Sequence, residues 1–193
     1  MKKKVAIFAS GTGSNFERIA DDLRLKEIMD IELLVCDRPG AAVIKKAEDR
    51  GIKTFVFAAR DYNSKEDYEK AIIEQVKDLD YIFLAGYMRI ISPYFLENYK
   101  KTILNLHPSL LPKYKGKDAI AQAYNAGDKE IGISIHYVNE ELDGGEVIEQ
   151  TFLTVKENET LESVTNRIHG LEHELYPKVI LELIKEALWR KEH

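Results

Sequence analysis

The sequence predicts an α/β fold built on an open, mostly parallel, doubly wound sheet. Short β-branched runs alternate along the chain with longer amphipathic stretches, which is the order that βαβ units produce. The runs are almost continuously hydrophobic, as expected of strands that helices cover on both faces. From residue 132 the alternation stops, because two strands follow each other with no room for a crossover helix. We therefore expect an antiparallel C-terminal extension of the sheet.

The expected elements can be placed along the chain in order. The parallel strands are expected at residues 5–9, 31–36, 54–57, 81–85 and 103–106, with helices at 15–26, 41–50 and 65–77. The antiparallel strands are expected at 133–138 and 147–155. A long C-terminal helix follows Thr160, whose hydroxyl can cap it, and its apolar residues recur at helical spacing as far as Trp189. Pro177 is expected to kink or split this helix.

Length and composition favour one domain that acts on small molecules. The 193 residues are 45% hydrophobic, enough for one α/β core and too few for two. The net charge is -5 and the charges are interleaved, so nothing favours nucleic acid or an anionic membrane as a partner. The single cysteine, Cys36, excludes an internal disulfide. The apolar run at 5–9 is too short for a signal peptide or a membrane span, and we expect a cytoplasmic protein.

The loop after the first strand, residues 10–15, predicts a phosphate site. Its glycines allow a tight turn, and free amides at the start of the next helix can bind an anion. A dinucleotide fingerprint would need a third glycine where Phe16 stands, although Asp37 is placed where an acid that binds ribose would be. We expect a monophosphate. The alternative is a plain strand-to-helix turn capped by Ser14 or Asn15.

Asn105 and His107 form the second candidate group, at the end of a strand. Their spacing of two residues places both side chains on one side of the sheet, where an amide and an imidazole can stabilise an oxyanion. No serine or cysteine nucleophile shares their motif, which disfavours a covalent acyl-enzyme. Asp143, flanked by glycines, is the candidate to orient the histidine and favour its charged form. The alternatives are a polar strand edge and a simple hairpin turn.

At residues 105–112 the sequence resembles the signature of the folate-dependent formyltransferases. Further motifs follow the order found in those members that act on phosphoribosylglycinamide, namely residues 10–15, 85–91, 141–145 and 172–177. The resemblance spans essentially the whole chain. It implies a Rossmann-like fold and transfer of a formyl group from 10-formyltetrahydrofolate, a co-substrate, to the amine of 5-phosphoribosylglycinamide in purine biosynthesis. It implies no metal.

The resemblance also implies a set of site residues within a single domain, 1–193. The catalytic residues would be Asn105, His107 and Asp143. The half spanning about 1–100 would bind the substrate phosphate through Gly13, Ser14 and Asn15. Glu172, from the other half, would assist. The folate pocket and the catalytic group would belong mainly to the other half, about 101–193. The residues expected to line the folate pocket are Lys65, Met88, Arg89, Ile90, Ile91, Asn105, Asn139, Glu140, Glu141, Leu142 and Asp143. Lys65 replaces a frequent arginine, and Asp118 a frequent histidine.

Other functions remain as alternatives. Formyltransferases that act on another phosphorylated amine, such as an amino sugar nucleotide, share the catalytic group. Those that act on methionyl-tRNA append a further domain and are expected to show basic surface, which this chain lacks. His169, Glu172 and His173 match the pattern of the inverted zinc proteases, but no third ligand is evident. A module that only binds a phosphorylated ligand would need the loop at 10–15 but not the polar group.

Overall fold

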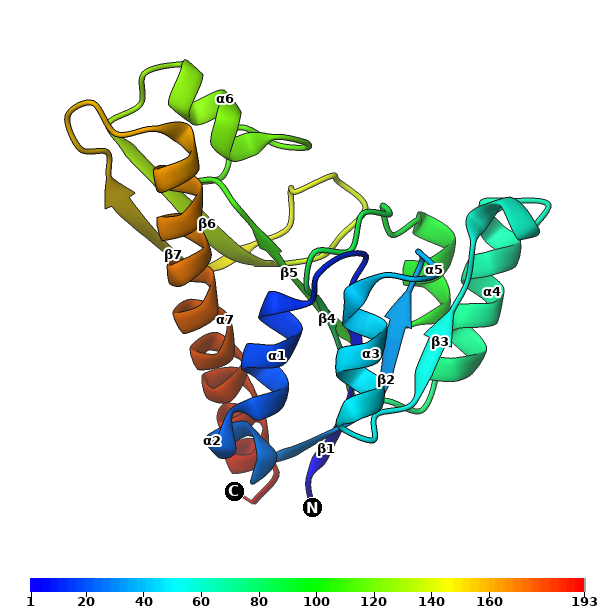
Figure 1. Ribbon diagram of the computed structural model, residues 1–193. Coiled ribbons are helices and arrows are strands. Elements are labelled where there is room, and N and C mark those ends of the chain that lie inside the picture. The colour runs from blue at the N-terminus through cyan, green and yellow to red at the C-terminus, as the bar shows by residue number, and fades with distance from the viewer. Residues whose placement is uncertain (193) are drawn as a thin grey trace.

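One seven-stranded sheet organises the residues that the computed structural model describes, 1–192, and the predicted fold class is confirmed (Figure 1). The strand order is β3-β2-β1-β4-β5-β6-β7. Neighbouring strands from β3 to β5 are parallel, whereas β6 pairs antiparallel with β5, and β7 pairs antiparallel with β6. The strands are β1 Lys3–Phe8, β2 Met29–Cys36, β3 Thr54–Val56, β4 Tyr81–Leu84, β5 Thr102–His107, β6 Glu130–Tyr137 and β7 Val147–Thr154.

The structure contains more helices than the sequence predicts, but the predicted helices lie where they were expected. They are α1 Ser14–Asp21, α2 Leu23–Lys26, α3 Ala42–Asp49, α4 Lys65–Val76, α5 Pro93–Asn98, α6 Ala119–Asn125 and α7 Leu161–Glu192, with a 3-10 turn at Ala59–Asp61. The single helix expected at 15–26 is divided at Asp22, whose backbone is extended. Its carboxylate accepts from the amides of Arg24 and Leu25 and so starts a new helix. The short α5 and α6 were not predicted.

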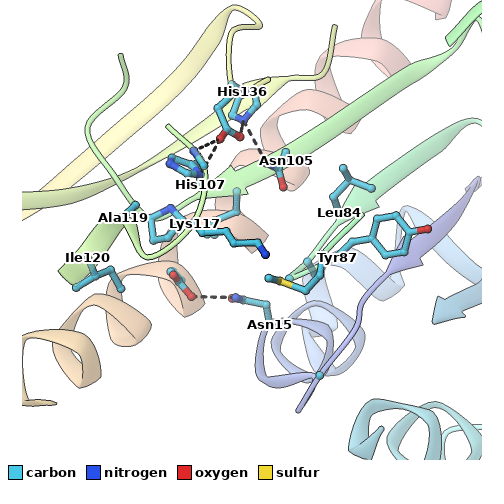
Figure 2. Close-up of a pocket in the computed structure, with 18 of the residues that line it drawn as sticks. Asn15, Leu84, Tyr87, Asn105, His107, Lys117, Ala119, Ile120 and His136 are labelled. Carbon is cyan, nitrogen blue, oxygen red and sulfur yellow. Dashed lines mark hydrogen bonds and ion pairs between the residues drawn. The ribbon is translucent and has the colours of Figure 1, made fainter. Parts of the chain in front are cut away.

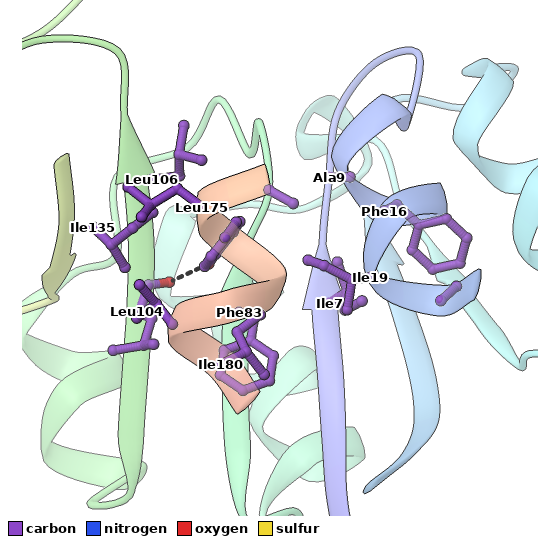
Figure 3. Close-up of a cluster of buried hydrophobic side chains, with 14 of the residues drawn as sticks. Ile7, Ala9, Phe16, Ile19, Phe83, Leu104, Leu106, Ile135, Leu175 and Ile180 are labelled. Carbon is purple, nitrogen blue, oxygen red and sulfur yellow. Dashed lines mark hydrogen bonds between the residues drawn. The ribbon is translucent and has the colours of Figure 1, made fainter. Parts of the chain in front are cut away.

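Two hydrophobic clusters hold helices against opposite faces of the sheet. The larger contains Phe16 from α1, Val43 from α3 and Tyr176 from α7. Figure 3 shows part of this cluster, with Phe16 on α1 and Ile180 on α7. The other contains Tyr68 from α4 and Phe95 from α5. Strands covered on both faces in this way explain why the sequence shows continuous apolar runs.

The C-terminal helix is continuous, so the expectation that Pro177 splits it is wrong. Pro177 is buried, and the neighbouring Tyr176 is anchored to the sheet, where its hydroxyl donates to the carbonyl of Leu84 at 2.8 Å. Packing of this face outweighs the lost backbone hydrogen bond of the proline. The predicted cap is present, since the Ser163 amide donates to Thr160 Oγ1 at 3.1 Å.

The sheet order places the candidate residues at one edge. Strands β2 and β3 lie on one side of β1, and β4 to β7 lie on the other, so the topology switches between β1 and β4. Open α/β sheets bind ligands at the carboxyl ends of the strands beside such a switch. The loops that follow β1 and β4, and the end of β5, all meet there.

Candidate active site

A cavity of about 880 Å³ opens at this edge of the sheet. Its size suits a small-molecule ligand. The loops after β1, β4, β5 and β6 line it together with the first turns of α7. It brings together every residue of the expected site except Lys65, namely Gly13, Ser14, Asn15, Met88, Arg89, Ile90, Ile91, Asn105, His107, Asn139, Glu140, Glu141, Leu142, Asp143 and Glu172.

Lys65 does not line the cavity. It is the exposed first residue of α4, whose start is set by Ser64, because the Ser64 hydroxyl accepts from the Asp67 amide at 3.1 Å. The buried side of α4 packs in the second hydrophobic cluster. The cap and the packing of α4 thus place Lys65 outside the cavity lining that holds the other expected folate residues, and its contact with folate stays a prediction.

The loop at 10–15 is shaped by a glycine. Gly13 has φ 77°, and a Cβ there would lie 2.5 Å from Val43 Cγ2. Gly13 is also the N-cap of α1 and no side chain caps the helix, so neither Ser14 nor Asn15 serves as the cap that the alternative reading required. The first amides of α1 thus remain available to an anion at the cavity wall.

Asn15 turns instead towards α7. Its Nδ2 donates to Glu172 Oε2 at 3.0 Å, and its buried Oδ1 has no hydrogen-bond partner within residues 1–192. The same Glu172 oxygen lies 3.2 Å from His169 Nδ1, and this hydrogen bond raises the pKa of His169. A buried carboxylate, an amide and an imidazole whose pKa is raised therefore lie beside the phosphate loop.

Asn105 has a partner that the sequence did not reveal. It lies directly opposite His136 in the antiparallel pair of β5 and β6. His136 Nδ1 donates to the Tyr137 carbonyl at 2.8 Å, so its Nε2 accepts from Asn105 Nδ2 at 3.3 Å (Figure 2). Burial lowers the pKa of His136 and so favours the neutral ring, which can accept this hydrogen bond. The carboxamide is thereby oriented, and its second Nδ2 hydrogen is left for a ligand.

His107 and Asp143 lie together, as the sequence led us to expect. Both side chains are buried, and His107 Nδ1 is 3.4 Å from Asp143 Oδ2. His107 Nε2 donates to the Tyr114 carbonyl at 2.8 Å, and Asp143 Oδ2 accepts from the Gly116 amide at 2.8 Å. Because Nε2 carries the proton in the neutral ring, a second proton on Nδ1 would face the carboxylate.

The loop that carries Asp143 is pressed against β6. Asp143 has φ 48°, a left-handed conformation that aspartate tolerates better than most residues. A Cβ on Gly145 would lie 1.7 Å from the Tyr137 carbonyl oxygen, so only glycine fits. The Asp-Gly-Gly segment therefore forms a tight turn, and this turn also brings the Asp143 carboxylate to His107.

The loop after β4 is fixed by an ion pair. Arg89 Nε donates to Asp37 Oδ2 at 2.9 Å. Ser10 Oγ donates a hydrogen bond to Asp37 and accepts one from the Met88 amide at 2.9 Å. Asp37 is thus engaged by protein partners and not free for a ribose. The loop leaves Met88 and Ile90 exposed, and Leu142 is exposed on the loop after β6. Such side chains suit a ligand with apolar rings.

The zinc-protease pattern on α7 does not form a ligand group. His169 is bonded to Glu172, and burial lowers the pKa of His173. Within the described residues, no three His, Cys, Asp or Glu side chains are grouped so that they could hold a metal ion. Nor is any described helix long and apolar enough to cross a membrane.

Comparison with known proteins decides the family. The family model of the formyl transferases matches residues 3–180. The chain belongs to this family. This formyl transferase is 48% identical to the phosphoribosylglycinamide formyltransferase of Bacillus subtilis, over 94% of the chain and 95% of the relative. It is 35% identical to the enzyme of that name from Escherichia coli, over 96% and 92%.

Solved structures agree with the fold of this formyl transferase. Glycinamide ribonucleotide transformylase 1 from Geobacillus kaustophilus superposes with a TM-score of 0.90 at 46% identity, covering 95% of this chain and all of that one. Phosphoribosylglycinamide formyltransferase from Bacillus halodurans gives a TM-score of 0.91 at 40% identity, covering 96% and 97%.

Proposed function

We propose that this formyl transferase moves the formyl group of 10-formyltetrahydrofolate to the amine of 5-phosphoribosylglycinamide in de novo purine biosynthesis. The observation that carries the proposal is a single cavity that holds both the phosphate loop and the group Asn105, His107 and Asp143. A phosphorylated amine anchored at Gly13 and Asn15 would present its far end to that group. The names of the relatives support this choice of acceptor.

The donor would occupy the side of the cavity formed by the loops after β4 and β6. Membership of the family implies a folate-type formyl donor. Residues 88–91 and 139–143 line this side, with exposed Met88, Ile90 and Leu142 for contact with its rings. Lys65 is left out of this proposal because it does not line the cavity.

In the proposed reaction the substrate amine attacks the formyl carbon directly. The C–N bond forms while the carbonyl electrons move to oxygen, and the free Nδ2 hydrogen of Asn105 and the imidazolium of His107 stabilise this oxyanion. For His107 to donate, its Nε2 exchanges the Tyr114 carbonyl for the substrate oxygen. Asp143 stabilises the charged ring. Collapse of the intermediate breaks the bond to the folate nitrogen, which takes up the proton that the amine loses, through Asp143 or a water molecule.

Binding at the phosphate loop serves this reaction by orientation. Contacts with the remote phosphate hold the amine beside the formyl carbon, so binding energy is used to align the reacting atoms. Both substrates are small molecules, and we propose that the enzyme works in the cytoplasm without a metal, a membrane or a nucleic acid.

The direct test is a mixture of protein, 10-formyltetrahydrofolate and 5-phosphoribosylglycinamide, in which release of tetrahydrofolate is followed. We expect release with this acceptor and much slower release with its dephosphorylated analogue. Faster reaction with an amino sugar nucleotide would assign the chain to the alternative acceptor. Equal rates with and without the phosphate would remove the proposed role of the loop.

A further inference from the structure

Lys117 is a cavity residue to which the proposed reaction has so far given no role. It lies on the loop between β5 and α6, and its side chain extends into the cavity between the catalytic group and Asn15 (Figure 2). We infer that the Lys117 ammonium binds the phosphate of the acceptor substrate, opposite the loop at 10–15. The inference rests on the proposed function, because it takes the ligand to be a phosphorylated amine.

The charges around the cavity favour this role. The loop at 10–15 contains no lysine or arginine, so it offers a phosphate dianion only backbone amides and the partial charge of a helix terminus. Arg89 also lines the cavity but is paired with Asp37 at 2.9 Å. His169 Nδ1 lies 3.2 Å from Glu172 Oε2, so a proton taken up by that ring is matched by the carboxylate. Since the catalytic His107 faces Asp143, Lys117 is left, among the described residues that line the cavity, as the cation available to balance the phosphate.

The ammonium of Lys117 is unengaged within the described residues. No carboxylate or carbonyl in that part of the chain pairs with it, and the residue is exposed. Lysine binds phosphate as a mobile point charge, which an unpaired and exposed ammonium can provide at little cost.

The main chain beneath this side chain is held in place. The Gly116 amide donates to Asp143 Oδ2 at 2.8 Å, and Gln122 Nε2 donates to the Lys117 carbonyl at 2.6 Å. Lys115 is paired with Glu141 at 2.7 Å. These two hydrogen bonds hold the backbone of Lys117 at the cavity rim, so the base of its flexible side chain stays beside the cavity. Lys117 directly follows Gly116, whose amide binds the catalytic Asp143. The proposed phosphate ligand and the partner of Asp143 are therefore neighbours in the chain.

Calorimetric binding of ribose 5-phosphate tests the inference without requiring catalysis. Lys117→Met removes the charge and keeps most of the side-chain length, whereas Lys117→Arg retains the charge. Lys113→Met is the matched control, since Lys113 lies on the same loop but outside this cavity, 3.4 Å from Asp128. We expect Lys117→Met to weaken binding about 10-fold, as for one lost charge-assisted hydrogen bond. Lys117→Arg and Lys113→Met should bind nearly as the wild type does.

Steady-state kinetics supply a second readout. For Lys117→Met we expect the KM for 5-phosphoribosylglycinamide to rise about 10-fold, with kcat and the KM for 10-formyltetrahydrofolate nearly unchanged. Equal binding of ribose 5-phosphate by wild type and Lys117→Met, or binding by neither, overturns the inference. So does a rise confined to the folate KM, which would assign the ammonium to the folate carboxylates.

The two proposals can fail separately. If the wild type binds ribose 5-phosphate through Lys117 but does not formylate 5-phosphoribosylglycinamide, the proposed function fails and the phosphate site stands. If the wild type formylates that acceptor and Lys117→Met is indistinguishable from it, the function stands and the role of Lys117 is refuted.

Discussion

Asn105 offers the sharpest test of a single side chain. Replacement by alanine removes one hydrogen-bond donor to the oxyanion, which at comparable sites costs about 10²–10³ in turnover. The side chain lies at the cavity wall and is only partly buried, so the fold should survive. Turnover is measured together with the circular dichroism of the variant. A folded Asn105→Ala protein with near-normal turnover would remove this residue from the mechanism.

Asp143 allows its charge to be separated from its structural role. In Asp143→Asn the amide oxygen can still accept from the Gly116 amide, a bond of 2.8 Å in the native protein, but the negative charge beside His107 is lost. We expect turnover to fall while binding of ribose 5-phosphate is unchanged, because the new amide can still hold the Gly116 segment that carries Lys117, and the loop at 10–15 lies elsewhere in the cavity. Loss of that binding as well would show that the substitution disturbs the loops and not only the chemistry.

His136 should make stability depend on pH. Burial lowers the pKa of its ring from the ordinary 6.5, so below that pH the unfolded chain binds a proton that the folded chain excludes. Its full contribution is therefore present above about pH 6.5 and is lost as the pH falls towards the folded-state pKa. We expect the free energy of unfolding of the wild type to drop more, between about pH 7 and 5, than that of His136→Gln. Urea titrations at several pH values measure it, and parallel curves would contradict the prediction.

Among the larger elements, the junction of β1, the phosphate loop and α1 depends most on one residue. Gly13→Ala places a Cβ 2.5 Å from Val43 Cγ2 at a φ of 77°, so we expect a loss of about 1–3 kcal/mol and weaker binding of ribose 5-phosphate. Gly11→Ala is the matched control, because a Cβ there would meet nothing within 4 Å. Thermal unfolding and calorimetry compare the two. Equal effects would show that the packing of Gly13 against α3 is unimportant.

The elements also show which parts of the fold local sequence encodes. The parallel strands and α7 were predictable because burial on both faces and helical periodicity leave long patterns. The break at Asp22 was not, since a cap within an amphipathic run is outweighed by the pattern around it. The predicted split of α7 at Pro177 was wrong because the sequence shows the missing backbone amide of proline but not the packing that keeps the helix continuous.

The candidate site was predictable where motifs place residues at strand ends. Asn105 and His107 share a face through their spacing alone, and Asp143 needed only a turn to reach them. The part of His136 depends on the register between β5 and β6, which spacing within one strand does not determine. The signal that could have pointed to it is a histidine at the fourth position of a predicted antiparallel strand.

The chain as a whole should fold as one unit, although its two halves were expected to bind different groups. Strand β4 pairs along its length with β5, and α7 packs in the same cluster as α1. A fragment of residues 1–100 would leave the β4 edge and the apolar face of α1 uncovered. We expect it to lack cooperative unfolding by heat, whereas the full chain should show a single transition. A cooperative transition in the fragment would divide the chain into two domains.

Direct transfer of the formyl group is the central claim, and a single-turnover experiment with formyl-labelled 10-formyltetrahydrofolate tests it most directly. With excess enzyme and 5-phosphoribosylglycinamide, the label should pass to the amine of the acceptor. Without the acceptor it should remain on the folate, and none should be found on the protein. Label bound covalently to the protein, or released as formate at the same rate with and without the acceptor, would contradict the account.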